Sequence, residues 1–246
     1  MRQHRLYFSG PLALNTRVTV QDNQAHYLTQ VLRLRPGDEV VLFNNGDHEF
    51  VAQIDTLSRK AVALRITDAA HVDTESALHI TLIQSLIRKE RFDFCIQKAT
   101  ELGVNRIVPV ITERTTAKLP SNRVAKRVAH WQGIAVSACE QSGRSRIPVI
   151  AAPTDLEAAI AQTTQTQRLV LDPWSTPTAL SSISRPTDVS IAIGPEGGFS
   201  PDEVNQLKAH GAATMTLGPR VLRSETAGIV AVALCQQLWG DLAPPT

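Results

Sequence analysis

The stretches IGPEGGFSPDE (residues 193–203) and LGPRVLRSETAG (residues 217–228) decide the fold of this chain. In each, an apolar run ends in Gly-Pro and is followed by a helix-start signature. Before the first stretch, VSIAI indicates a buried strand, and Ser200, Pro201 and Glu203 match the capping pattern at the start of a helix. In open α/β sheets, ligands bind beyond the carboxyl ends of the strands. The pattern therefore predicts two strand-to-helix corners, each able to line a site.

Both corners have a structural alternative. The three glycines of residues 194–198 allow a ligand to approach the backbone closely, but a tight turn that needs positive φ explains them equally well. In the second corner, Ser224 is predicted to cap an apolar helix that reaches Trp239. That helix is apolar on more than one side, which fits a core helix or a subunit interface. Neither corner has a dinucleotide or P-loop glycine pattern, or a G-x-S-x-G elbow. Such loops suit an adenosine-like ligand that is not held by its phosphates.

The rest of the chain divides into two patterns. Short strands at 6–8, 17–20, 39–43, 50–54 and 61–66, with one helix near 25–32, predict a compact N-terminal β-barrel. From about residue 77, strands alternate with helices, which predicts an α/β domain around a mainly parallel sheet. The expected strands there are 78–82, 106–111, 168–171, 189–193 and 213–217, and the expected helices include 91–102 and 121–142. A polar stretch places the boundary between domains 1–72 and 73–246.

Composition limits the possible classes of function. The 246 residues are 43% hydrophobic and 20% charged, which is typical of a globular protein. The first residues contain no apolar signal region, and no apolar run is long enough to span a membrane, so we expect a cytoplasmic protein. Cys95, Cys139 and Cys235 are far apart and odd in number, which predicts reduced, buried thiols. No His/Cys cluster has metal-ligand spacing, so no metal is expected.

Positive charge is concentrated in the middle of the sequence. Residues 76–150 carry 12 Lys/Arg against 5 Asp/Glu, whereas residues 1–75 have a net charge of −1 and residues 151–246 of −4. Such asymmetry indicates a face for a polyanion, although a solvated basic surface would look the same.

Several stretches together resemble the bacterial 16S ribosomal RNA (uracil-N3)-methyltransferases of the knotted SPOUT superfamily. They are RLYF, HYLTQVLRLRPGDEV, KATELGVNRIVPV, SACEQSGRSRIP, IGPEGGFS and LGPRVLRSETA, in family order along almost the whole chain. The resemblance implies an N-terminal PUA-like RNA-binding β-barrel and a C-terminal SPOUT α/β domain with a deep trefoil knot. It also implies a homodimer that uses S-adenosylmethionine to methylate N3 of a uridine in 16S rRNA of the small ribosomal subunit. Within the chain, the LDPW segment matches the family least well.

By position, the resemblance also implies a set of site residues. Those expected to bind the cofactor are Leu171, Asp172, Gly194, Pro195, Glu196, Gly197, Gly198, Leu217, Gly218, Leu222, Arg223, Ser224, Thr226 and Ala227. Arg223 is the first candidate for a catalytic residue, since a guanidinium can stabilise negative charge on the uracil oxygens. Glu225 either accepts the N3 proton or only favours the helix dipole. Glu196 is expected to brace the glycine loop.

Basic side chains of the barrel and the middle segment are the predicted RNA contacts. They are Arg5, Arg33, Arg35, Arg88, Lys89, Arg91, Arg114 and Arg144. Arg144, with Arg146, could instead approach the active site of a partner subunit. Two alternatives to the main interpretation stay open. One is a SPOUT methyltransferase that acts on a ribose 2′-hydroxyl or another base, and the other is a non-catalytic RNA-binding or ribosome-assembly protein.

Overall fold

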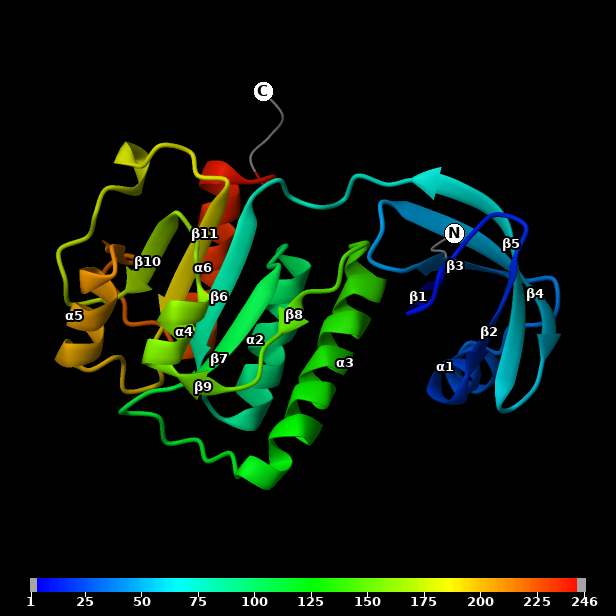
Figure 1. The fold of residues 1–246 in the computed structure, drawn as a ribbon, viewed down its shortest axis with the longest axis horizontal. Helices are drawn as coiled ribbons and strands as arrows, with labels where there is room; N and C mark the ends of the chain where they lie inside the picture. The colour runs from blue at the N-terminus through cyan, green and yellow to red at the C-terminus, as the bar shows by residue number, and fades with distance from the viewer. Residues whose placement is uncertain (1–3, 243–246) are drawn as a thin grey trace. The chain divides into compact units, whose positions relative to one another are not determined.

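The structure is a computed structural model that describes residues 4–242 (Figure 1). The chain folds into two compact units. The first consists of the described residues up to Glu75 together with Cys139–Ile147, and the second of Ser76–Ala138 together with the described residues from Pro148 onward. The chain thus leaves the first unit near Glu75 and returns to it for one short segment.

The first unit is built on a five-stranded sheet in the order β1-β3-β4-β5-β2. β1 is parallel to β3, and the other neighbours are antiparallel. Its elements are β1 (Arg5–Tyr7), β2 (Arg17–Gln21), α1 (Asp22–His26), the π-helical turn η1 (Tyr27–Val31), β3 (Glu39–Phe43), β4 (His48–Leu57) and β5 (Ala61–His71). All five predicted strands and the short helix are present. Within the described residues no ladder joins β1 to β2, so the predicted barrel is not closed by hydrogen bonds between these two strands.

The segment Cys139–Ile147 belongs to the first unit because arginines and carboxylates hold it there. Arg5 pairs with Glu49 and also donates to the carbonyl oxygens of Cys139 and Arg144, at 2.6 and 3.0 Å. Arg144 pairs with Glu75 at 2.6 Å, and Glu75 also accepts from the backbone N–H groups of residues 145 and 146. Arg144 is buried and the Arg5 side chain nearly so. The prediction that these two arginines bind RNA is therefore wrong for this arrangement, since their guanidinium groups have partners inside the unit.

The second unit contains a parallel sheet in the order β12-β10-β11-β6-β7-β8, with β9 also paired to β7. Its strands are β6 (His79–Ser85), β7 (Arg106–Ile111), β8 (Val149–Ile150), β9 (Thr154–Asp155), β10 (Gln167–Leu171), β11 (Asp188–Ile193) and β12 (Ala212–Met215). Its helices are α2 (Lys89–Glu101), η2 (Ser121–Arg123), α3 (Val124–Ser142), α4 (Leu156–Gln162), η3 (Leu180–Ser182), α5 (Pro201–Ala209) and α6 (Ser224–Trp239), the last residues of α3 belonging to the first unit. The predicted α/β domain with a parallel sheet is confirmed.

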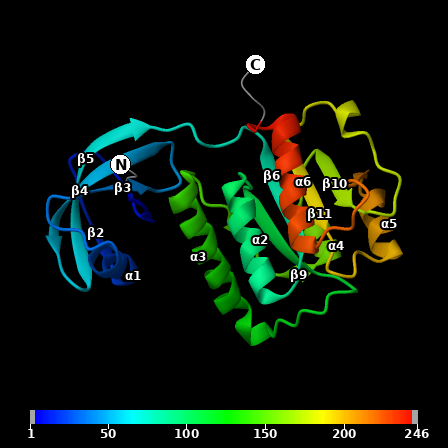
Figure 2. The same ribbon diagram turned by 180° about the vertical axis from the view of Figure 1, so that it is seen from behind.

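Helices cover both faces of this sheet. In Figure 1, α4 and α5 lie in front of it, and Figure 2, seen from behind, shows α2 and α6 side by side on the opposite face. α6 packs on α2 and on strands β6 and β11. On the other face, α4, α5 and the sheet enclose a core that includes Val108, Ile160, Val170 and Leu207. The central strands are buried on both faces, which accounts for their nearly continuous apolar sequence.

Glycines end three helices where the sequence predicts, and a capping box begins one of them at the expected residue. Gly103, Gly143 and Gly211 follow α2, α3 and α5 with φ of +87°, +89° and +84°, the left-handed region that glycine enters at least cost. Ser200 caps α5 through a complete capping box with Glu203. At α6 the prediction is wrong: the cap position is Arg223, and Ser224 is the first helical residue, its side chain free for another partner.

The three cysteines are free and buried. Burial raises the pKa of the Cys95 and Cys235 thiols to about 12, which keeps them protonated at neutral pH. None of the helices in residues 4–242 has both the length and the apolar character needed to cross a membrane.

Candidate active site

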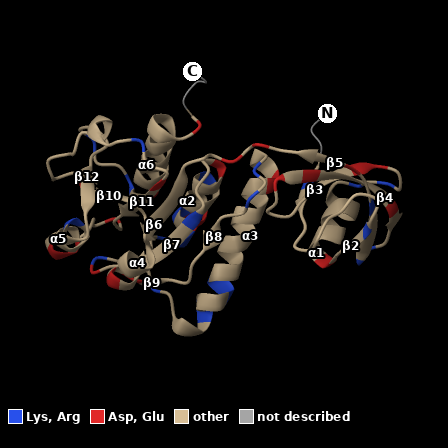
Figure 3. Cartoon of the chain, turned by 45° about the horizontal axis from the view of Figure 1, so that its top comes forward, with Lys and Arg blue, Asp and Glu red and all other residues tan. Residues whose placement is uncertain are grey.

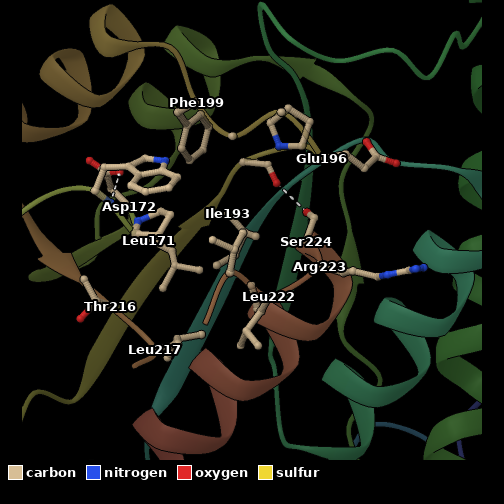
Figure 4. A pocket seen from close by; sticks show the side chains of 18 of the residues that line it. Leu171, Asp172, Ile193, Glu196, Phe199, Thr216, Leu217, Leu222, Arg223 and Ser224 are labelled. Carbon is tan, nitrogen blue, oxygen red and sulfur yellow. Dashed lines mark hydrogen bonds between the residues drawn. The ribbon is translucent and has the colours of Figure 1, made fainter. Parts of the chain in front are cut away.

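The candidate site lies beyond the carboxyl ends of three neighbouring strands of the second unit. β10 stands between β12 and β11, with Leu171 opposite Met215 and Val170 opposite Ala192, so the three strands end at one level. The loops that follow them enclose a pocket of about 540 Å³, shown in Figure 4. That size is in the usual range for small-molecule sites. The structure therefore has a cavity at the predicted position, the ends of the parallel strands.

The loop after β11 needs its glycines. A Cβ on Gly194 would lie 2.7 Å from the backbone nitrogen of Phe199 and 2.9 Å from the carbonyl carbon of Gly198, closer than real Cβ atoms come. Gly198 itself has φ of +68°. The turn therefore folds back on itself, with Gly197 and Glu196 on the pocket wall. The turn geometry accounts for Gly194 and Gly198, and the same loop lines the pocket. The structural explanation of the glycines and the ligand-site explanation are therefore compatible.

Two side chains from other segments brace this loop. Arg114 donates from Nη1 to the carbonyl oxygens of Gly197 and Phe199, at 3.1 and 3.2 Å. Glu203, besides its part in the capping box, accepts from the backbone N–H of Glu113 at 2.8 Å. Glu196, the residue predicted to brace the loop, is exposed and makes no hydrogen bond within the described residues. That prediction is wrong, since the bracing comes from Arg114 and Glu203.

One hydrogen-bond chain joins the two corners. Ser224 Oγ donates to the carbonyl oxygen of Gly194 at 2.5 Å, the contact dashed in Figure 4. The same Oγ accepts from Gln84 Nε2 at 2.9 Å, and Gln84 is completely buried at the end of β6. A Cβ on Gly228, one turn along α6, would lie 2.7 Å from Gln84 Oε1, so Gly228 makes room for the amide. The start of α6 is thereby fixed to the end of β11.

The turn after β10 completes the pocket. Asp172 Oδ1 accepts from the backbone N–H of Trp174 at 3.1 Å, and Oδ2 accepts from Ser175 Oγ at 2.5 Å. Lys208 of α5 donates to the same Ser175 hydroxyl at 3.0 Å. Asp172 is therefore occupied in holding its own turn, and the pocket receives Leu171, Asp172, Pro173 and Trp174 as one preformed wall.

Four arginines line the pocket: Arg91, Arg114, Arg220 and Arg223. Arg220 and Arg223 are exposed at the second corner, and Figure 4 shows the Arg223 side chain extended from the start of α6. Arg91 of α2 places Nε 3.6 Å from Glu225 Oε1. Glu225 is buried, and its Oε2 has no hydrogen-bond partner in the described part of the chain. The walls between these charges are apolar and include Leu171, Ile193, Leu217 and Leu222.

The pocket brings together all of the predicted cofactor-binding residues except Thr226, which is exposed on α6. Of the two predicted catalytic residues, Arg223 lines the pocket and Glu225 does not. Glu225 instead places its carboxylate 3.6 Å from Arg91, a pocket cation, and its role as proton acceptor stays a prediction. Two predicted RNA contacts, Arg91 and Arg114, belong to the pocket. The remaining ones, Arg33, Arg35, Arg88 and Lys89, are exposed.

Comparisons with known proteins identify the family. A family model described as an RNA methyltransferase domain matches residues 74–236, and one described as an RNA methyltransferase PUA domain matches residues 20–67. A Buchnera aphidicola protein named ribosomal RNA small subunit methyltransferase E is 34% identical over 96% of this chain and 94% of its own. The chain belongs to this RNA methyltransferase family.

Solved structures of the family have the same fold. A putative methyltransferase from Legionella pneumophila, in complex with bound cofactor SAM, is 37% identical with a TM-score of 0.94 over 98% of this chain and 100% of that one. A ribosomal RNA small subunit methyltransferase E from Neisseria gonorrhoeae, bound to S-adenosyl methionine, is 36% identical with a TM-score of 0.91 over the same shares. The family resemblance and the PUA-like N-terminal domain are thereby confirmed.

Sequence reasoning missed several residues that line the pocket of this family member. They are Pro173, Trp174, Ile193, Phe199, Val204 and Thr216, besides Arg91 and Arg114. Arg220 and Val221 also line the pocket and lie inside the second corner, which was expected to line a site. Ile193, Phe199 and Thr216 could have been found, since the first two lie inside the first corner and the third lies directly before the second corner. Arg91 and Arg114 gave no such signal because they come from α2 and from the segment after β7, far from both corners in sequence.

We predict that Ser224→Ala breaks the hydrogen-bond chain that joins the two corners and so destabilises the fold. It leaves the buried Gln84 amide and the Gly194 carbonyl without their shared partner, so the free energy of unfolding should fall by about 1–3 kcal/mol. Thr226→Ala is the matched control on the same helical turn, where an exposed hydroxyl should matter by less than about 0.5 kcal/mol. Urea denaturation measures both, and equal effects of the two substitutions would contradict the structural role of Ser224.

Proposed function

We propose that this protein is an S-adenosylmethionine-dependent methyltransferase that methylates N3 of a uridine in 16S rRNA of the small ribosomal subunit. The observation that carries the proposal is the single pocket built by both glycine corners, in a chain whose relatives bear the name ribosomal RNA small subunit methyltransferase E. Two family structures of about the same identity are complexes with S-adenosylmethionine.

The residues present fit this cofactor. An adenosine and an aliphatic sulfonium chain need apolar walls together with backbone groups at close range, and the pocket offers Leu171, Ile193, Leu217 and Leu222 beside the glycine turn 194–198. Gly194 is required by the turn, as a Cβ there would strike backbone. We propose that these apolar walls and the glycine turn hold the cofactor, together with Asp172, Pro195, Gly218, Ser224 and Ala227.

Methylation at N3 makes two demands on the protein. When bound, S-adenosylmethionine supplies an electrophilic methyl group on a sulfonium sulfur. The uracil must lose its N3 proton to solvent water, although the pKa of that proton in solution lies well above neutrality, and N3 must be held close to the methyl group. We propose that Arg223, exposed on the pocket wall, stabilises the negative charge that develops on the uracil oxygens. A cation in that place lowers the pKa of N3 and so raises the fraction of reactive anion.

Glu225 and Arg91 extend this electrostatic arrangement. The 3.6 Å separation of Arg91 Nε and Glu225 Oε1 joins a pocket arginine to a buried carboxylate at the start of α6. We propose that Glu225 positions Arg91 and takes no proton itself. A carboxylate at a helix N-terminus is also favoured by the helix dipole, which offsets part of the cost of burying it.

RNA binding is assigned to the exposed basic residues. Figure 3 shows Lys and Arg on α2 and along the first turns of α3. Lys126 and Arg127 belong to these turns, and Arg123 ends the short helix η2 directly before them. With Arg88 and Lys89 they give the second unit a basic face, and Arg33 and Arg35 add two exposed cations in the PUA-like unit. Such residues neutralise phosphates without reading sequence, so we propose that they supply affinity and that the pocket supplies specificity.

A homodimer is proposed on the exposed side of α6. Leu234 and Leu238 are exposed on this helix, and Val230 and Ala233 beside them are only half-buried. One face of α6 packs on α2 and the sheet, so a second apolar face has no partner within the described chain. An apolar face of this kind is typical of a subunit interface. The homodimer would act in the cytoplasm, where its rRNA substrate is assembled and its thiols stay reduced.

We further propose that the C-terminal segment is knotted. Its support is the path of the chain: from the edge strand β12, the chain crosses to α6, which packs on β11 and β6 on the far side of β10. We propose that the segment 216–223 threads through the loop that connects β10 and β11. A crystal structure in which 216–223 does not thread that connection would refute the knot.

The product of the reaction tests the proposed function. Small subunits from a strain that lacks this protein are incubated with it and with methyl-labelled S-adenosylmethionine, and the rRNA nucleosides are separated by mass spectrometry. We expect label in 3-methyluridine, from 16S rRNA alone. Label in a 2′-O-methyl nucleoside or another base would show a different methyltransferase, and no label would favour a non-catalytic RNA-binding protein.

The role of Arg223 has a pH signature. Because the reactive uracil is the anion, the methylation rate should rise with pH up to the apparent pKa of N3, and Arg223→Ala should raise that pKa. The curve of rate against pH then moves to higher pH, and the rate at neutral pH falls by about 100-fold or more, with affinity for S-adenosylmethionine changed by only a few fold. Arg220→Ala, at the neighbouring exposed arginine, is the control and should leave the curve in place. A lost cofactor affinity in Arg223→Ala, or an unmoved curve, would contradict the proposed role.

A further inference from the structure

The pocket carries one large aromatic side chain that nothing in the described part of the protein covers. Trp174 is 84% exposed, whereas the other two tryptophans of the chain, Trp131 and Trp239, are 3% and 5% exposed. Within the described residues the Trp174 indole takes part in no ring stacking or cation–π contact. A tryptophan left in water at the edge of a site is unusual, because its large apolar surface is normally buried.

The backbone beneath Trp174 is held firmly. Pro173 fixes one backbone dihedral, and Asp172 accepts from the Trp174 N–H and from the Ser175 hydroxyl. Lys208 of α5 donates to that hydroxyl from the other side, and Asp172 N–H donates to the carbonyl oxygen of Met215. The turn therefore presents an indole from a fixed point on the pocket wall. Because the backbone under this side chain is already ordered, it loses little conformational entropy when a ligand binds.

The arginines that line the same pocket indicate the kind of ligand. Arg220 and Arg223 line the same pocket and are exposed like Trp174. Cations and a free aromatic face in one pocket are the combination that binds single-stranded nucleic acid, with bases stacked on the ring and phosphates neutralised by arginine. Phe199 and Ile193, which line the interior of this pocket, are only 8% and 1% exposed. Trp174 belongs to the rim, where a macromolecular substrate would enter.

We propose that Trp174 is a substrate-binding residue that stacks on an unpaired base of the RNA at the mouth of the pocket. The inference rests on the proposed function and adds to it the contact that holds the strand while a uridine occupies the site. Stacking needs a π face and no hydrogen-bond pattern, so Trp174 contributes affinity for any base, and the uracil specificity comes from the interior.

Kinetics provide the first test. Trp174→Ala should raise KM for unmethylated small subunits by about tenfold or more, the effect of losing one stacked base. Affinity for S-adenosylmethionine, measured by calorimetry, should stay within about twofold, and kcat should change little. Trp174→Phe keeps a ring and should recover most of the loss. Val149→Ala, at an exposed apolar residue of the same unit that does not line the pocket, is the control and should leave KM unchanged.

Fluorescence tests the stack without turnover. Since the other two tryptophans are buried, acrylamide quenching of the native protein reports Trp174. Adding a single-stranded oligouridylate of about ten nucleotides should quench the emission and shield it from acrylamide, and Trp174→Phe should abolish both effects. Unchanged KM in Trp174→Ala, or no shielding by RNA, would overturn the proposal. So would a loss of affinity for S-adenosylmethionine, which would place the ring on the adenine. If the wild-type protein methylates no RNA, the proposed function fails, and the shielding result still decides the role of Trp174.

Discussion

The hydroxyl of Ser224 determines how the active site is built. It donates to the carbonyl oxygen of Gly194 and accepts from the amide of the buried Gln84, so one oxygen joins β11, α6 and β6. A buried carbonyl and a buried amide each cost free energy when left without partners, and this single group satisfies both. Gly228 is part of the same arrangement, since a larger residue there would meet Gln84. The sequence SETAG therefore serves to place a helix start against a glycine turn.

The chemistry follows from that placement. Once the two corners are held together, their backbone and apolar atoms enclose one pocket at the ends of β10, β11 and β12, and the arginines of the second corner stand on its wall. Transfer of a methyl group to N3 needs alignment and an anion-stabilising charge, both of which rigid loops with fixed cations can supply. The turn at Asp172, held by Ser175 and Lys208, adds the third wall and carries Trp174 to the rim.

Most of the secondary structure was predictable from the sequence because Gly and Pro mark its limits. Gly103, Gly143 and Gly211 end their helices, and the capping box at Ser200 starts α5 as expected. Contacts between distant segments were not predictable. Ser224 had the pattern of a cap, and only the approach of Gly194 shows that its hydroxyl serves the neighbouring loop.

The contacts of the arginines were also not predictable from the sequence. Arg5 and Arg144 have internal partners that no local pattern reveals, because Glu49, Glu75 and the end of α3 come from other parts of the first unit. Glu225 was placed in the active site by its position in the motif, whereas in the structure it contacts Arg91 of α2. Trp174 stood in the segment that matched the family least, so its exposure could be recognised only from the structure.

A crystal structure of this protein grown with S-adenosylmethionine tests the central claim most directly. We predict one molecule of the cofactor in contact with both corners, the turn 194–198 and the segment 217–224, with the Ser224–Gly194 hydrogen bond intact. A cofactor that contacts only one corner, or that binds with this hydrogen bond broken, would contradict the account.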